Sequence, residues 1–569
     1  MLKKYAINLQ KEDKFQYVIA ILLLIVYAGA LFFPLMDKDA ARHANVALKM
    51  YETGEYWKLI ERNTNYLDKP HLLFWGSLLS YKLFGVNTFA VRLPHIIYAL
   101  IAVYSTYKLT KHLSDKTTAK LAALMLATAQ AFVLAIADAR METPLTAGII
   151  FGLWHLVVFI DRRRLINIVL AALGLAVAFS TKGWVGPVIA FISAFFYVLL
   201  NKKWAVFIQA KTWLFLPFFL LFISPVLYSY YLQFDLHPEI VVRGTSGHSG
   251  VKFILWEQNF ERFDGDRFAP GEGGRNKEYF FLYHTFLWAF FPWSIAACAA
   301  LFFWAKRVIY KKKWRSPFSF APLSFFLVLF LISFSNFKMP HYIIMLFPLA
   351  AMMTAPYLRV ALSYAKSLRF YLRLHLVLAV LIIPVVILLN YYFFSPATLF
   401  ITIAGPLLLI AFLFLITKKW NATALKTVCL GAAISIILNF FLYYNFFPNL
   451  MQYQGGNVMV QEMKKRTIVV PDASIRLIEN NAHTFDFHRQ YNHELVSLDS
   501  FKNNAAQFRD NYFLVSDYFI NELKKEGFTI EPAITAPDYN VSTVDGKFLN
   551  PKTRAAELDT LVLGKIYKP

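Results

Sequence analysis

Long apolar stretches separated by short polar turns run from near the amino terminus to about residue 447. A helix that crosses a membrane needs roughly 17 to 25 predominantly apolar residues, and stretches of that length predict about thirteen transmembrane helices here. We expect them near residues 15–36, 89–107, 119–137, 143–160, 165–180, 184–200, 213–232, 284–304, 319–335, 341–358, 372–391, 396–416 and 425–447. The pattern therefore predicts an all-α polytopic membrane domain.

The pattern changes near residue 449, where charged and amide residues return. Short apolar runs alternate there with helix-like stretches such as 517–526, and the runs lie at 467–470, 512–515 and 561–563. Such alternation indicates a small α/β fold. We expect a transmembrane domain over 1–448 and an α/β domain outside the cytoplasm over 449–569.

Composition agrees with a membrane protein. The chain has 569 residues, 58% of them hydrophobic and 17% aromatic, which excludes an ordinary soluble domain. Its two cysteines, Cys298 and Cys429, lie within or beside apolar spans and far apart, so the sequence predicts no disulfide framework and no CxxC motif.

Charge orients the predicted helices. Lysine and arginine in short loops mark the cytoplasmic side of a membrane. Alternate connections are basic here, at 3–14, 108–116, 162–164, 202–211, 306–315, 359–369 and 418–419. With an odd number of spans, the amino terminus lies inside and the carboxyl terminus outside. The net charge of +23 is spread among hydrophobic spans, which argues against nucleic-acid binding.

The unusual polar residues gather in the outer loops. Asp39 and Arg42, preceded by Asp37, follow the first apolar segment, which has no small-residue cleavage site and is expected to be retained. Three residues apart, Asp39 and Arg42 share a face if the segment is helical. They form either a surface ion pair at a helix start or a site in which a carboxylate accepts a proton from an attacking group.

Asp68 and Lys69 come later in the same outer loop, just before an amphipathic run at 72–81 that is too short to span and suits a helix in the membrane interface. At that depth the Lys69 ammonium either pairs with a phosphate headgroup or anchors the helix.

Two further outer turns carry charges between hydrophobic spans, where charge is costly unless it is paired. They are Asp138-Ala139-Arg140-Met141-Glu142 and Asn336-Phe337-Lys338-Met339-Pro340-His341-Tyr342. Interfacial anchoring explains either turn alone. Cations on the outer side, against the positive-inside bias, favour a functional site.

Over roughly 30–360 the chain resembles the polyprenyl-phosphate-sugar-dependent glycosyltransferases of the GT-C class, which include lipid A aminoarabinose transferases and, more distantly, protein O-mannosyltransferases (glycosyltransferase families 39 and 83). The ordered motifs that carry this resemblance are Asp39-Ala40-Ala41-Arg42, Asp68-Lys69-Pro70, Arg92-Leu93-Pro94, Arg140-Met141-Glu142, Thr181-Lys182-Gly183 and Lys338-Met339-Pro340-His341-Tyr342.

The resemblance implies an inverting hexosyl- or pentosyltransferase of the bacterial inner membrane, with its site on the periplasmic face. It takes a sugar from a polyprenyl phosphate to a lipid, glycan or protein, as in lipid A modification or protein glycosylation of the cell envelope. Asp39 is then the catalytic base and Glu142 the second acidic residue, and the donor phosphate is held by Arg42, Lys69, Lys338 and Tyr342. Further site candidates are Asp37, Asp68, Arg140 and Lys182.

No cofactor is expected. Some relatives bind a divalent metal, but the long outer loop has no histidine between His248 and His284, which argues against a metal here. Ala40 stands where the family commonly has a second acidic residue, and Asp37 is the alternative acid.

Two other classes of protein also have many helices and charged residues. A transporter or lipid flippase tends to carry its charges near the midplane and in repeated halves. Here the charges lie at the outer rim and no repeat is visible. The other class is a non-catalytic scaffold that binds partners through its outer domain.

Overall fold

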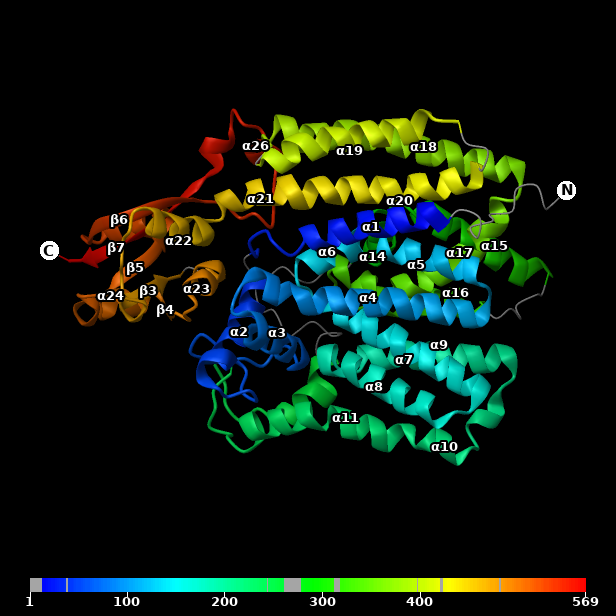
Figure 1. The fold of residues 1–569 in the computed structure, drawn as a ribbon. Helices are drawn as coiled ribbons and strands as arrows, with labels where there is room; N and C mark the ends of the chain where they lie inside the picture. Colours follow the sequence, from blue (N-terminus) through cyan, green and yellow to red (C-terminus); the bar gives the residue numbers. More distant parts are fainter. Residues whose placement is uncertain are drawn as a thin grey trace.

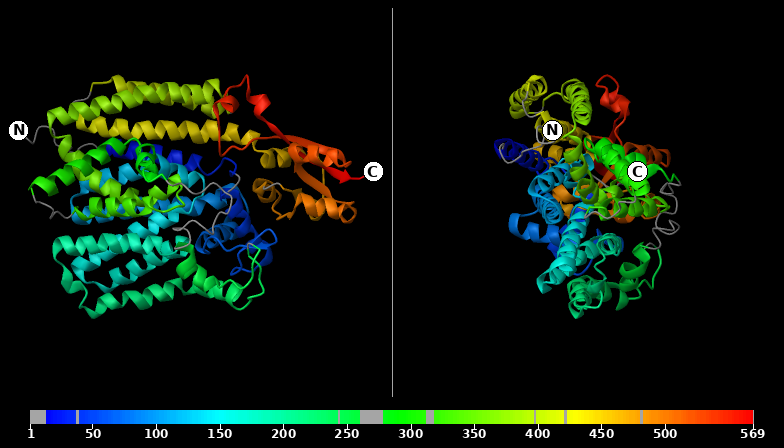
Figure 2. Two further views of the ribbon diagram at one scale, coloured as in Figure 1. Left: turned by 180° about the vertical axis from the view of Figure 1, so that it is seen from behind. Right: turned by 90° about the vertical axis from the view of Figure 1, so that its right-hand side faces the viewer.

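A computed structural model shows a long helical bundle with a small sheet at one end (Figure 1). It describes residues 13–36, 39–242, 244–259, 278–311, 318–396, 398–419, 423–479 and 482–568. The sheet lies beyond one end of the bundle, and a second view shows the same arrangement (Figure 2).

The helices of the bundle form where the apolar stretches predict them. They are α1 (Asp13–Gly29), α4 (Thr88–Leu113), α5 (Lys116–Ala127), α6 (Gln130–Ala137), α7 (Glu142–Arg162), α8 (Leu165–Lys182), α9 (Val185–Asn201), α10 (Ala210–Trp213), α11 (Phe215–Tyr230), α14 (Phe281–Ala289), α15 (Ser294–Lys311), α16 (Phe320–Ser333), α17 (Phe347–Ala361), α18 (Ala365–Ile387), α19 (Leu399–Thr417) and α20 (Thr423–Phe441). The prediction of an all-α polytopic domain is confirmed.

Within the described residues, eight helices are long and apolar enough to cross a membrane, and nine if the bent pair α5 and α6 is one span. That pair bends by 54°. The polar groups at the break are satisfied, because the Gln130 amide donates to the carbonyl of Phe291 and the Trp293 indole donates to the Thr128 hydroxyl. Four further apolar helices are shorter than 18 residues.

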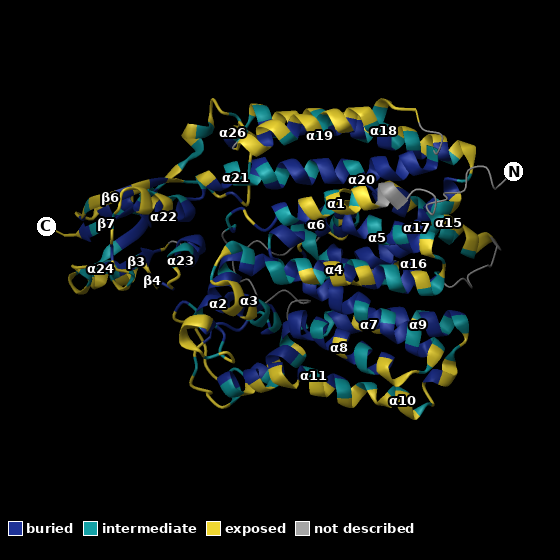
Figure 3. Ribbon diagram, viewed as in Figure 1, coloured by how far each residue is buried: buried dark blue, intermediate teal, exposed yellow. Residues whose placement is uncertain are grey.

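Burial differs sharply between neighbouring helices (Figure 3). In the most apolar part of the span Thr423–Tyr453, which contains α20, 89% of the residues are buried, whereas in α19 only 17% are. The outer face of α19 exposes large apolar side chains, including Leu399, Leu407 and Ile410. Exposed apolar area of this extent is expected only where lipid replaces water.

Helices α7 and α8 pack at close range through glycine. An added Cβ at Gly148 of α7 would lie 2.7 Å from the Gly174 carbonyl oxygen and the Ala178 nitrogen of α8. Gly148 and Gly152 are four residues apart, the small-residue spacing that lets membrane helices approach closely. These glycines hold together the two helices whose outer ends carry Glu142 and Lys182.

We predict that Gly148→Ala lowers the free energy of unfolding by about 1 to 3 kcal/mol, because backbone atoms cannot move aside for the methyl group. The matched control is Gly76→Ala in α3 (Leu72–Phe84), where the added Cβ meets Pro94 at an ordinary 3.5 Å. Unfolding of both variants in detergent measures the difference. Equal stability of the two variants would contradict the prediction.

The carboxyl-terminal region forms a five-stranded mixed sheet in the order β4-β3-β5-β7-β6. Strand β3 pairs in parallel with β4 and β5, and β7 runs antiparallel to β5 and β6. The strands are β3 (Ile475–Ile478), β4 (Glu494–Val496), β5 (Tyr512–Ser516), β6 (Thr529–Asp538) and β7 (Asp559–Tyr567). The helices of this region are α22 (Gly455–Lys465), α23 (His483–Arg489), α24 (Leu498–Asn503), α25 (Asp517–Lys525) and α26 (Gly546–Leu549). The predicted strands at 512–515 and 561–563 and the predicted helix at 517–526 are confirmed.

The apolar run at 467–470 does not form a strand. Thr467 has a left-handed φ of 54°, and the backbone amide of Ile468 donates to the end of α22 at Met463. Val470 is buried against the sheet while Val469 is 87% exposed. The segment therefore packs as a loop, and its apolar residues serve the core without joining the sheet.

Candidate active site

Asp39 is the first residue of α2 (Asp39–Thr53), so the first outer loop becomes helical where the sequence predicts a helix start. The ion pairs differ from the predicted one. Arg42 pairs with Glu61 through two bonds, Nε to Oε1 at 2.7 Å and Nη2 to Oε2 at 2.6 Å. Asp39 instead faces Arg140, with 3.5 Å between Oδ2 and Nη1. Arg42 and Asp39 thus stand on one helix but pair with different parts of the chain.

Lys69 lies 3.1 Å from Asp68, with both side chains about four fifths buried. The next residues start α3, the amphipathic helix that the sequence predicts. The Tyr66 hydroxyl also contacts Asp68, at 3.4 Å. The Lys69 ammonium is therefore held in a short turn by Asp68, which Tyr66 also contacts.

Glu142 and Lys182 form a buried ion pair of 2.9 Å between facing helix ends. Glu142 begins α7 and Lys182 ends α8, so each charge lies where the helix dipole favours it. The Lys182 ammonium lies 3.8 Å from the centre of the Tyr342 ring, and His341 Nε2 lies 3.6 Å from Glu142. The Thr-Lys-Gly and Lys-x-Pro-x-Tyr turns are thereby brought together on the Arg-x-acidic turn.

Arg140 links Asp39 to Glu142 indirectly, because it faces Asp39 and contacts His341, which lies beside Glu142. Its guanidinium contacts Asp138 and lies 2.8 Å from Nδ1 of His341. Ala139, just before it, has a left-handed φ of 47°, which turns the chain sharply between α6 and α7. Burial raises the pKa of Asp138 despite the adjacent Arg140.

These residues surround one cavity of about 800 Å³. Of the residues expected in the site, those in its lining are Asp39, Arg42, Asp68, Lys69, Arg140, Glu142, Lys182 and Tyr342. Asp37 lies outside the described residues. The outer motifs thus converge across a large separation in the sequence.

Lys338 does not belong to the described lining of this cavity. Its ammonium is buried and donates to the carbonyls of Ser333, at 2.7 Å, and Glu278, at 3.0 Å. Burial lowers the pKa of Lys338. These bonds stabilise the turn that carries His341 and Tyr342.

The lining residues that the sequence interpretation did not assign to the site include Glu61, His43 and His341. His341 stands inside a motif already singled out, which is the signal that points to it. Glu61 carries no local signal, because its place depends on the hairpin of β1 (Ile60–Glu61) and β2 (Thr64–Asn65) folding back onto α2.

The two acidic residues differ in environment. The Asp39 side chain is 53% exposed, whereas that of Glu142 is 4% exposed. Burial on its own would raise the pKa of Asp39, but His43, Arg140 and Lys69 hold it below its ordinary value. Asp39 is therefore an ionised, accessible carboxylate, the state that a general base requires.

Among the described residues, no group of three or more His, Cys, Asp or Glu side chains is placed to hold a metal ion. The cavity lining carries four cations and four carboxylates, which contact one another in pairs: Arg42 with Glu61, Lys69 with Asp68, Arg140 with Asp39, and Lys182 with Glu142.

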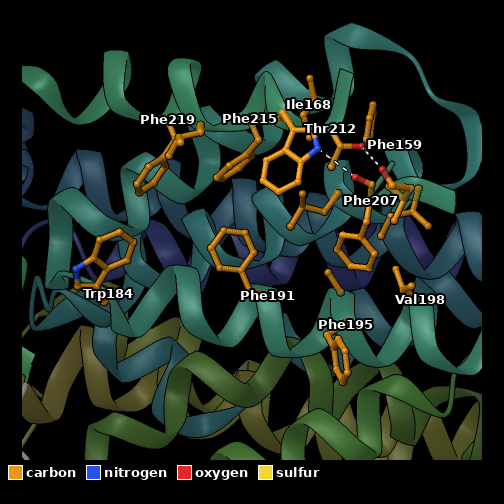
Figure 4. A pocket seen from close by; sticks show the side chains of 16 residues that line it. Phe159, Ile168, Trp184, Phe191, Phe195, Val198, Phe207, Thr212, Phe215 and Phe219 are labelled. Carbon is orange, nitrogen blue, oxygen red and sulfur yellow. Dashed lines mark hydrogen bonds between the residues drawn. The ribbon is translucent and has the colours of Figure 1, made fainter. Parts of the chain in front are cut away.

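A second cavity, of about 520 Å³, lies among α7, α8, α9, α10 and α11 (Figure 4). Its lining is almost wholly apolar and includes Phe159, Trp184, Phe191, Phe215 and Phe219. It holds no charged side chain among its described lining residues, so acid–base chemistry belongs to the first cavity.

Parts of the chain are similar in sequence to known proteins. Residues 68–229 match the family of dolichyl-phosphate-mannose-protein mannosyltransferases. An uncharacterized protein of Aquifex aeolicus is 28% identical over 458 residues, 79% of this chain and 82% of that protein. The undecaprenyl phosphate-alpha-4-amino-4-deoxy-L-arabinose arabinosyl transferase of Pseudomonas aeruginosa PAO1 is 25% identical over 343 residues, and the match covers 58% of each chain.

The fold has a solved counterpart. The crystal structure of ArnT from Cupriavidus metallidurans bound to undecaprenyl phosphate superposes with a TM-score of 0.71 at 15% identity, covering 96% of this chain and 97% of ArnT. The chain therefore has the fold of ArnT, and it is similar over part of its length to multi-pass membrane glycosyltransferases.

Proposed function

We propose that this protein transfers a sugar from a polyprenyl-phosphate donor to a lipid, glycan or protein acceptor. The observation that carries the proposal is the cavity of about 800 Å³ in which one accessible carboxylate, Asp39, faces a set of fixed cations. A phosphate leaving group needs cations, and an attacking hydroxyl or amine needs a base. The similar arabinosyl transferases, whose names include undecaprenyl phosphate, support this donor class.

The proposed reaction is a single displacement. Asp39 accepts the proton of the acceptor group as its oxygen or nitrogen attacks the anomeric carbon. The bond between that carbon and the phosphate oxygen breaks, and the lipid phosphate leaves with the electron pair. Attack opposite to the leaving group inverts the anomeric configuration.

Lys69 and Arg42 are proposed to hold the phosphate, with Arg140 and Lys182 adding positive charge. Arg42 already shares its guanidinium with Glu61 and therefore approaches the phosphate from a fixed direction. Glu142 is proposed to act through Lys182 and His341, since its carboxylate is buried against them. Tyr342 positions Lys182 by the contact of its ring with the ammonium.

We propose that the cavity faces the periplasm of a bacterial inner membrane. The basic connections predicted to be cytoplasmic include the ends of α7 and α9, and the cavity lies at the opposite ends of α7 and α8. The α/β region of 449–569 is proposed to form a separate domain on the cavity side of the membrane.

The lowered pKa of Asp39 predicts the acid limb of the rate profile. A base works when it is deprotonated, so kcat/KM should stay high until the pH falls below 3.8, the ordinary value of this group. Arg140→Gln removes one cation that lowers the pKa and should move the limb to higher pH. A limb that stays in place in this variant would contradict the assignment of Asp39.

The first test of the proposed function is sugar transfer by purified protein in lipid with a panel of polyprenyl-phosphate sugars. Lys69→Ala should raise the donor KM by about 10- to 100-fold, the loss expected for a charged hydrogen bond of roughly 1.5 to 3 kcal/mol. Lys58→Ala is the matched control, because Lys58 lies in the same loop and pairs with Glu55 outside the cavity.

Absence of turnover with every donor would contradict the proposed function. Turnover with an unchanged donor KM in Lys69→Ala would contradict only the phosphate assignment of Lys69.

A further inference from the structure

The β1–β2 hairpin forms part of the cavity wall through Glu61, Thr64 and Asn65. Its turn places Arg62 next to Glu61, with a left-handed φ of 54° at Arg62. The Arg62 side chain points away from solvent and is 6% exposed. A buried guanidinium requires a carboxylate partner, because an unpaired buried charge is costly.

That partner comes from the carboxyl-terminal region, more than 400 residues later in the sequence. Arg62 Nε donates to Asp486 Oδ2 of α23 at 2.8 Å, and the Asp486 side chain is fully buried. Asp486 Oδ1 lies 2.8 Å from Nδ1 of His493, which is also fully buried. The carboxyl-terminal region, called the outer region below, therefore supplies the carboxylate that pairs with Arg62 of the β1–β2 hairpin.

The network continues into the outer region and anchors Asp486. His493 Nε2 lies 3.3 Å from Asp472, and Arg489 donates to the same carboxylate oxygen at 2.6 Å. Burial on its own would lower the pKa of His493, but its bonds to Asp472 and Asp486 raise it. Alternating charges thus extend from Arg62 to Arg489.

A second contact holds α23 against the helix that begins with Asp39. The Asn45 amide of α2 donates to the backbone carbonyl of His483 at 2.7 Å, and Asn45 is buried. Helix α2 therefore contacts α23 directly, while the hairpin contacts it through Arg62. The hairpin in turn directs Glu61 onto Arg42, one turn along α2 from Asp39.

We infer that Asp486 and its partner His493 are positioning residues for sugar transfer: they hold Arg62, and through the hairpin they direct Glu61 to orient Arg42 at the cavity wall. The outer region then contributes to the site by fixing the orientation of Arg42. Loss of the Asp486 charge leaves Arg42 present but poorly oriented toward the donor phosphate.

The direct test measures hydrogen–deuterium exchange of the hairpin in wild type and Asp486→Asn, both as full-length protein in lipid. We expect faster exchange at residues 60–65 in the variant, with unchanged exchange in α7 and α8. Lys502→Ala is the matched control, since Lys502 pairs with Glu522 and Glu526 elsewhere in the outer region. Unchanged exchange at 60–65 in folded Asp486→Asn would overturn the inference.

The second readout is a mutant cycle on transfer kinetics, which rests on the proposed function. Asp486→Asn should raise the donor KM by about 3- to 10-fold with little change in kcat, the coupling typical of residues in one network. In a Glu61→Gln background the same substitution should add less than about twofold, because the path through Glu61 is already lost. Full multiplication of the two effects would overturn the inference.

Arg62→Gln probes the same contact from the membrane side and decides the question if Asp486→Asn does not fold. It should change hairpin exchange and donor KM in the same direction, and normal values for both would overturn the inference. Wild type without activity on any donor would refute the proposed function, while the exchange measurement would still test the positioning of the hairpin.

Discussion

Asp39→Asn is expected to lower kcat for sugar transfer by about 10²- to 10⁴-fold, the range that a positioned general base contributes. Asparagine keeps the shape of the side chain but cannot take up the proton of the acceptor. The loss should appear in single-turnover rates, with donor binding largely retained, because the phosphate cations stay in place.

The structure also indicates that this variant folds. The Asp39 side chain is half exposed and lies 3.5 Å from Arg140, a long and partly solvated pair. Exposed pairs of this kind contribute little to stability. Glu55→Gln serves as the control, because Glu55 belongs to the same outer loop but not to the described lining of the cavity. Wild-type turnover in Asp39→Asn would remove Asp39 from the role of base.

Glu142→Ala is expected to have the largest effect on stability, lowering the free energy of unfolding by about 3 to 5 kcal/mol. Its carboxylate is 4% exposed and pairs at 2.9 Å with Lys182, itself 11% exposed. Removing the carboxylate leaves the Lys182 ammonium buried beside Arg140 and His341 without its counter-charge. Breaking a buried pair costs more than the pair contributes, because the remaining charge is not solvated.

The control for this prediction removes both charges. Glu142→Ala combined with Lys182→Met should recover much of the lost stability, since no unpaired charge remains buried. Sugar transfer should stay impaired in the double variant, which separates the structural role of the pair from its role in the site. An unfolding midpoint in Glu142→Ala equal to that of wild type would contradict the assignment.

The transmembrane architecture follows from the sequence alone. A span requires a run of apolar residues of sufficient length, and that requirement is local. Each predicted stretch is therefore helical in the described part of the chain, even where a break divides it, as between α5 and α6. Helix α3 and the strand β5 were predictable for the same reason. The spacing of their apolar residues and the length of each segment are visible in the local sequence.

The membership of the candidate site was only partly predictable. The sequence predicts that the motifs around Asp39, Lys69 and Glu142 lie in loops on the same side of the membrane. Their meeting around one cavity required the folded chain. Lys338 shows the limit of this reasoning, because a lysine in the expected motif turned its ammonium toward backbone carbonyls.

The sequence by itself predicted the apolar helices of the bundle and the change of composition near residue 449. Tertiary structure alone decided which charges pair. Arg42 pairs with Glu61, 19 residues away, and not with Asp39 on its own helix. Arg62 pairs with Asp486 at a separation of 424 residues. The physical reason is that span formation depends on local hydrophobicity, whereas the partner of a buried charge depends on which distant carboxylate the packing brings within a hydrogen bond.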